Sequence, residues 1–154
     1  MDKARATAKD ETIAFEPGRL GPDLNEKKVL IVEDDYFSQK LFDKIVGDNL
    51  TDITPIFAVN FEDATKWLIS NHGIQLAIFD IFLEDQRTGL DLYRQCMLND
   101  EWRIPIIITS AISERELLEL VGPDLPRPIF LKKPFRPEHC ATLIKSILNP
   151  ELKS

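Results

Sequence analysis

Short apolar runs alternate with longer amphipathic segments from Lys27 onward, and this alternation is the feature that most constrains the fold. It is typical of β-α units arranged around a parallel sheet. All runs except the second are almost continuously apolar, as expected for strands that helices cover on both faces. The sequence therefore predicts an α/β fold with a doubly wound, five-stranded parallel sheet. The predicted strands are Val29–Glu33, Ile53–Val59, Gln75–Asp80, Ile104–Ser110 and Pro128–Leu131.

The segments between and after these runs predict five helices, because their apolar residues recur at helical spacing. Asn60 is a suitable N-cap for the second helix, and Ser113 followed by Glu116 fits a capping box at the start of the fourth. Pro137 suits the first turn of the fifth helix, where its missing N–H leaves no hydrogen bond unmade. We expect the apolar side of each helix to pack on the sheet.

The length, charge and cysteine content of the chain limit its function. A chain of 154 residues suits a single domain with one core. Its 19 Lys and Arg residues against 26 Asp and Glu give a net charge of -7, so direct nucleic-acid binding is not expected. Cys96 and Cys140 match neither a metal-ligand spacing nor a redox pair, and we expect both to be reduced and buried.

The N-terminal segment differs in composition from the rest of the chain. Residues 1–26 mix charged residues, alanine, proline and glycine, which predicts a flexible arm; docking of Ile13 and Phe15 is the less favoured alternative. Residues 27–150 form the predicted domain, and residues 151–154 a short C-terminal tail. No stretch resembles a signal peptide or reaches transmembrane length, so we expect a cytoplasmic protein without membrane insertion.

Acidic residues follow two of the apolar runs, at the edge where parallel strands end and where open α/β folds bind ligands. Glu33, Asp34 and Asp35 follow the first run, and ordinary acidic capping of a strand-to-helix turn explains them as well as a binding site does. Asp80 interrupts LAIFDIFL where an internal strand is most buried, and a bare carboxylate there is costly. We therefore expect a divalent cation and a lysine to neutralise Asp80.

A hydroxyl and a lysine follow the fourth and fifth runs. Ser110 ends the fourth run, with Thr109 as the alternative one register step away. Lys133 follows the fifth run, with Lys132 as the adjacent alternative and a pair of solvated lysines as the explanation without function. The Lys133–Pro134 bond is a candidate cis peptide. Acids, a single Asp, a hydroxyl and a lysine, each after its own strand, together indicate a site for magnesium and phosphoryl chemistry.

Four segments carry a resemblance to the receiver domain of two-component response regulators, namely KKVLIVEDDYFSQKLF, QLAIFDIFLEDQRTGLDLY, IPIIITSA and PIFLKKPF. In order, they span nearly the whole chain from Lys27 to the last helix. The resemblance implies a flavodoxin-like sheet with strand order 2-1-3-4-5. Because little follows the fifth helix, we expect a stand-alone receiver without a DNA-binding or enzymatic output domain.

The resemblance implies roles for the acids. Glu33 and Asp34 correspond to the acid pair that holds Mg²⁺ in the family, and Asp80 corresponds to the phosphoacceptor. Direct ligands of Mg²⁺ are then expected from Asp34, Asp80 and the backbone carbonyl of Phe82, with Glu33 acting through water.

The resemblance also implies which residues respond to phosphorylation. Ser110 is preferred to Thr109, because the family usually places its switch hydroxyl directly before an alanine, here Ala111. Lys133 is preferred as the phosphoryl contact, because the family's lysine precedes a proline. Phe130 corresponds to the switch aromatic on the last strand. Phosphorylation is then expected to draw Ser110 inward, bury Phe130 and change the surface of the fourth helix and fifth strand.

The implied function is signalling by a phosphoprotein. A histidine kinase or a histidine phosphotransfer protein would supply the phosphoryl group, and a downstream protein target would receive the signal. A relay role and an adaptor role both stay open, and the family also allows a homodimer through its fourth and fifth helices. Beyond autophosphotransfer and slow self-dephosphorylation, no enzymatic activity is expected.

The loop after Asp80 departs from the family pattern. It reads IFLEDQRTG, lacks the usual Met-Pro and reaches Gly89 one residue late, so we expect a longer and more acidic loop over residues 81–89. Phe82 and Ile112 stand at the two positions that flank the attacking water in receivers. Neither side chain can hold water by hydrogen bonding, which predicts a long-lived phosphoaspartate.

Two other classes of function fit parts of this pattern. A receiver-like scaffold that never takes phosphate would explain the unusual loop, but the intact acids, hydroxyl and lysine argue against it. A magnesium-dependent phosphatase of the haloacid dehalogenase type also uses an Asp at a strand end. Such enzymes need a second Asp two positions later, where this chain has Phe82, so the phosphatase is the less favoured alternative.

Overall fold

The structure, a computed structural model, describes residues 27–70, 73–83 and 88–149. The N-terminal arm expected over residues 1–26 and the tail expected over residues 151–154 lie outside the described residues, as does the acidic middle of the loop after Asp80.

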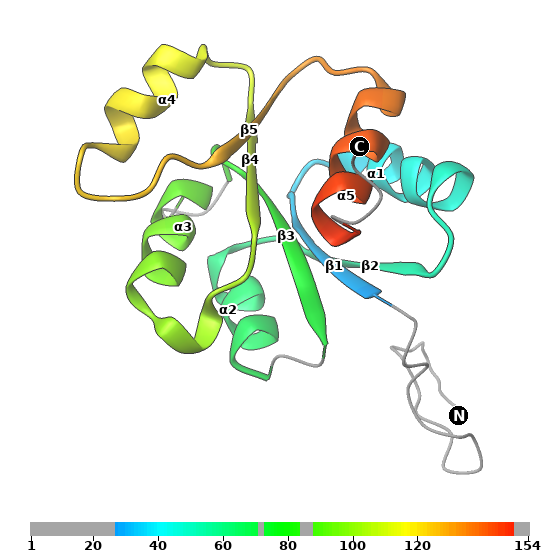
Figure 1. Cartoon of the computed structure of the whole chain (residues 1–154), viewed down its shortest axis with the longest axis horizontal. Helices are drawn as coiled ribbons and strands as arrows, with labels where there is room; N and C mark the ends of the chain where they lie inside the picture. The colour runs from blue at the N-terminus through cyan, green and yellow to red at the C-terminus, as the bar shows by residue number, and fades with distance from the viewer. Residues whose placement is uncertain (1–26, 71–72, 84–87, 150–154) are drawn as a thin grey trace.

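The described strands form one parallel sheet of order β2-β1-β3-β4-β5, which confirms the predicted fold class (Figure 1). Their bounds are β1 (Lys27–Val32), β2 (Ile53–Ala58), β3 (Ile74–Asp80), β4 (Ile106–Ser110) and β5 (Ile129–Lys132). These bounds agree with the predicted ones to within two residues. The largest differences are at the starts of β1 and β4, and β4 begins later than predicted because Pro105 has no N–H to donate to the ladder.

Helices cover both faces of this sheet (Figure 1). The five α-helices of the described residues are α1 (Tyr36–Asn49), α2 (Phe61–Ser70), α3 (Gly89–Leu98), α4 (Glu114–Val121) and α5 (Pro137–Leu148), and a short 3-10 helix η1 spans Asp100–Trp102. Neighbouring residues of a strand point to opposite faces. Leu30 accordingly packs with the helices α2, α3 and α4, whereas Ile31 packs with α1 and α5.

The predicted helix starts are confirmed. Asn60 Oδ1 accepts a hydrogen bond from the Asp63 backbone N–H at 2.8 Å, at the start of α2. Ser113 and Glu116 form the capping box that opens α4. Pro137 is the first residue of α5. Local sequence signals therefore place these helices at the carboxyl ends of the strands they follow.

Both cysteines are free and buried, as predicted. Burial raises the pKa of the Cys96 and Cys140 thiols to about 12. These side chains therefore act as small apolar core residues. In the part of the chain that the structure describes, no helix is both long enough and apolar enough to span a bilayer.

Candidate functional site

The three acids after β1 lie in three different environments. Glu33 is almost fully buried, with 1% of its surface exposed, and its Oε2 accepts a hydrogen bond from the Asp35 backbone N–H at 3.1 Å. Asp35 is exposed and its Oδ2 accepts from the Ser38 backbone N–H at 2.8 Å, so it is the N-cap of α1. Asp34, between them, is half-buried. Helix capping therefore explains Asp35. It does not explain Glu33 and Asp34, which are buried and half-buried respectively.

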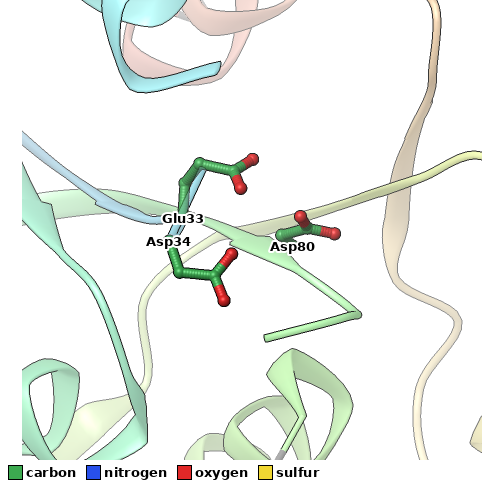
Figure 2. A group of neighbouring side chains, drawn as sticks. All are labelled: Glu33, Asp34 and Asp80. Atoms are coloured by element: carbon green, nitrogen blue, oxygen red, sulfur yellow. The ribbon is translucent and has the colours of Figure 1, made fainter. Parts of the chain in front are cut away.

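Asp80 ends β3 beside these acids. It is 7% exposed, and its Oδ1 accepts a hydrogen bond from the backbone N–H of Phe82 at 3.2 Å. Carboxylate oxygens of Glu33, Asp34 and Asp80, one from each residue, lie within 4.8 Å of one another. Figure 2 shows the three side chains gathered at the neighbouring ends of β1 and β3. We call Glu33, Asp34 and Asp80 the acid cluster.

The two lysines at the end of β5 have different partners. Lys133 Nζ donates to Glu33 Oε1 at 3.1 Å and to Asp80 Oδ2 at 3.2 Å. Lys132 Nζ instead donates to two backbone carbonyls of the loop after β4. The Lys133–Pro134 peptide bond is cis, as the Lys-Pro pair suggested. Of the two lysines that the sequence offered, Lys133 is the one beside the acid cluster.

The two hydroxyls at the end of β4 also differ. Thr109 Oγ1 donates to the Leu131 carbonyl at 2.8 Å, so this hydroxyl is occupied by the neighbouring strand. Ser110 lies one residue further toward the carboxyl edge than Thr109, which pairs in register with Asp80. Ser110 Oγ accepts from the Ile112 backbone N–H at 3.3 Å, and as a hydroxyl it still has a hydrogen to donate. Ser110, which is 1% exposed, is therefore the better candidate of the two for a hydroxyl that donates to a group on Asp80.

The acid cluster places three carboxyl groups beside the single ammonium of Lys133. Burial raises the pKa of Glu33 to about 7, the charge of Asp80 acts in the same direction, and Lys133 offsets only part of this. Burial lowers the pKa of the Lys133 ammonium, but the carboxylates of Asp80 and Glu33 outweigh it and raise that pKa above its usual value. Three converging carboxylates beside one ammonium are a donor set that fits Mg²⁺, which prefers hard oxygen ligands.

The start of α3 fixes the backbone around Asp80. The Gly89 N–H donates to the Ile81 carbonyl at 3.0 Å, and a capping box between Thr88 and Asp91 opens the helix. A Cβ atom added at Gly89 would lie 2.0 Å from the Asp80 carbonyl oxygen, which is far too close. Only glycine therefore lets α3 begin at this position. From the sequence, Gly89 marks only the end of the loop after Asp80, and no local pattern signals this contact.

The remaining predicted residues lie on β5 and in the loops that follow β3 and β4. Phe130 is half-buried on β5 and packs against the core on the α3 side of the sheet, where Ile112 also packs. Phe130 also borders an open groove with Phe135 and Arg136. Phe82 is 58% exposed beside Asp80. Phe82 and Ile112, at the two positions predicted to flank an attacking water, both carry apolar side chains.

Comparisons with solved structures identify the fold. A response regulator of Chloroflexus aurantiacus, described as putative, matches with a TM-score of 0.68 and 21% identity over 80% of this chain and 98% of its own. The signal receiver domain of a histidine kinase from Syntrophus aciditrophicus matches with a TM-score of 0.67 and 23% identity, over 83% and 94%. The chemotaxis protein CheY4 of Vibrio cholerae matches with a TM-score of 0.63 and 18% identity, over 79% and 98%. No family model and no curated protein matches the chain.

The chain has the fold of a response regulator receiver domain. The resemblance that four short segments indicated is thereby confirmed at the level of the fold. At these identities the comparisons speak to the fold alone, and the chemistry of the site rests on its own residues.

Proposed function

We propose that this protein is a phosphoacceptor receiver that takes a phosphoryl group onto Asp80 from a histidine kinase or a histidine phosphotransfer protein. The observation that carries this proposal is the arrangement of charges at one strand edge. The carboxylates of Glu33, Asp34 and Asp80 converge there, and Lys133 Nζ lies 3.2 Å from Asp80 Oδ2.

The proposed transfer uses Asp80 as the nucleophile. One carboxylate oxygen of Asp80 forms a bond to phosphorus while the phosphorus–nitrogen bond of a phosphohistidine breaks, and the imidazole leaves with the bonding electrons. Glu33, Asp34, Asp80 and the backbone carbonyl of Phe82 would hold Mg²⁺, which supplies balance for the negative charge on the phosphoryl oxygens. Lys133 pairs with a phosphoryl oxygen, since its ammonium already lies beside Asp80.

The proposed response to phosphorylation begins at Ser110. Its hydroxyl hydrogen is directed to a phosphoryl oxygen on Asp80, which draws the end of β4 inward. Phe130, half-buried on the neighbouring strand, then turns into the vacated space. The surface formed by α4 and β5 changes, and a downstream protein target binds the changed surface.

The mass of the protein after incubation with Mg²⁺ and acetyl phosphate tests the proposed function. We expect a gain of one phosphoryl group in the unmodified protein and no gain in Asp80→Asn, an isosteric variant without the nucleophile. An unmodified protein that gains no mass would be a receiver-like scaffold. Steady release of phosphate without accumulation would instead indicate a phosphatase. Either result would overturn the proposal.

A further inference from the structure

Lys132, the last residue of β5, is bonded to the loop between β4 and α4. Its Nζ donates to the Ala111 carbonyl at 2.8 Å and to the Ile112 carbonyl at 3.2 Å. The neighbouring Lys133 points into the acid cluster, so the two adjacent ammonium groups serve different parts of the molecule. The role of Lys133 leaves these contacts of Lys132 unexplained.

The two carbonyls belong to the backbone that joins the proposed switch hydroxyl to α4. Ser110 pairs in register with Lys132, and Ala111 and Ile112 follow Ser110 directly. The Ile112 N–H donates to Ser110 Oγ, and Ser113 is the N-cap of α4. One ammonium on β5 therefore holds the segment through which a movement of Ser110 reaches α4.

These contacts accompany a conformation in which Ser110 Oγ accepts from the Ile112 N–H and Phe130 is only half-buried, which is the arrangement proposed to precede the switch. A movement of Ser110 toward Asp80 carries the Ala111 and Ile112 carbonyls with it, because they are covalently continuous with Ser110. The Lys132 contacts are then stretched or lost. An interaction present in only one of two conformations shifts their equilibrium toward that conformation.

We propose that Lys132 is a positioning residue that holds the β4–α4 loop in the conformation that precedes the switch and thereby shifts the equilibrium away from the switched conformation. This inference rests on the proposed function. Two hydrogen bonds from an exposed ammonium change a conformational equilibrium by roughly threefold to tenfold. Lys132 would thus tune how strongly phosphorylation of Asp80 is transmitted to α4.

The sign of the effect separates this role from general electrostatics. Beryllofluoride, an anionic mimic of the phosphoryl group, binds a cluster that is already negative in a chain of net charge -7. Removal of a nearby positive charge weakens the binding of an anion if charge alone matters. Removal of Lys132 strengthens the binding of beryllofluoride if Lys132 restrains the switch. The two explanations therefore predict opposite changes.

The test measures the apparent Kd of beryllofluoride at saturating Mg²⁺, together with the amide chemical shifts of residues 111–113 before beryllofluoride is added. Lys132→Met removes the ammonium and keeps the aliphatic stem, whereas Lys132→Arg keeps a cation that can donate to carbonyls. Lys66→Met is the matched control, because Lys66 is an exposed lysine of α2. Thermal melting of each variant checks that the fold is intact.

We expect Lys132→Met to bind beryllofluoride about threefold to tenfold more tightly than the unmodified protein. Its amides at residues 111–113 should lie partway toward their bound positions, while Lys132→Arg and Lys66→Met resemble the unmodified protein. Unchanged or weaker binding by Lys132→Met, in a series where the unmodified protein responds to beryllofluoride, would overturn the role of Lys132 alone. If the unmodified protein itself does not respond, the proposed function fails and this inference fails with it.

Discussion

The charge of Glu33 makes the stability of the metal-free protein depend on pH. Burial and the charge of Asp80 raise its pKa from 4.5 to about 7. Between these two values the carboxyl ionises in the unfolded chain but not in the folded one, so ionisation favours unfolding. The free energy of unfolding therefore falls as pH rises through this window, by on the order of 3 kcal/mol.

Glu33→Gln removes this titration and keeps a side-chain oxygen that accepts from the Asp35 N–H. In EDTA, we expect the variant to be more stable than the unmodified protein by about 1–3 kcal/mol near pH 8, and the two to converge near pH 4.5. Urea unfolding at a series of pH values measures the difference. Glu62→Gln, at an exposed acid of α2, should keep the pH dependence of the unmodified protein. Parallel stability curves for the unmodified protein and Glu33→Gln would show that burial does not perturb Glu33.

At the residue scale we also predict that Phe82 governs the lifetime of the proposed phosphoaspartate. Its backbone N–H donates to Asp80 Oδ1, and its exposed phenyl ring has no polar atom with which to orient a water for attack on phosphorus. We expect Phe82→Asn, which introduces an amide, to speed dephosphorylation by about tenfold or more. Decay of the phosphorylated mass after removal of acetyl phosphate measures the rate, and Ile69→Asn on α2 is a control at another exposed apolar residue. Loss of phosphate from the unmodified protein within seconds would contradict this account.

At the scale of elements, the start of α3 sets the backbone of the site. Gly89→Ala places a Cβ 2.0 Å from the Asp80 carbonyl oxygen, so α3 must shift away from the end of β3. We expect a destabilisation of about 1–3 kcal/mol together with weaker Mg²⁺ binding, measured by urea unfolding and by metal titration. Gly47→Ala on α1 is the matched control, because an added Cβ there meets open space, and it should be neutral or stabilising. Equal effects of the two substitutions would exclude a role for the contact at Gly89.

Element by element, the sequence predicted those features that depend on local pattern. Apolar runs gave the strands, and the capping residues Asn60 and Ser113 gave the helix starts. The polarity of Lys132 and Lys133 does not separate them, and only the resemblance to receivers, through the proline after Lys133, favoured Lys133. The structure shows the physical difference, which is the direction in which each ammonium points. The close approach of Gly89 to Asp80 depends on the packing of α3, which no local pattern encodes.

At the scale of the whole molecule, the elements best placed to respond lie at one side of the sheet. β4 carries Ser110 and pairs with β5, and the loop after β4 leads into α4, whereas β2 is the opposite edge strand and is separated from β3 by β1. The central strands are buried on both faces and have little freedom to move. We therefore expect beryllofluoride with Mg²⁺ to shift the amide resonances of residues 110–135 and to leave those of β2 largely unchanged. Chemical-shift changes confined to the residues around the acid cluster would show that binding of beryllofluoride does not alter α4 and β5.

The central claim is that Asp80 itself receives the phosphoryl group, and mapping the modified residue tests it most directly. Borohydride reduces an aspartyl phosphate to homoserine, so protein treated with Mg²⁺ and acetyl phosphate and then reduced carries a mass change at the modified residue. Peptide mass spectrometry should locate this change at residue 80 and find none at Glu33 or Asp34. A change at any other acid, or none anywhere in a folded protein, would contradict the account.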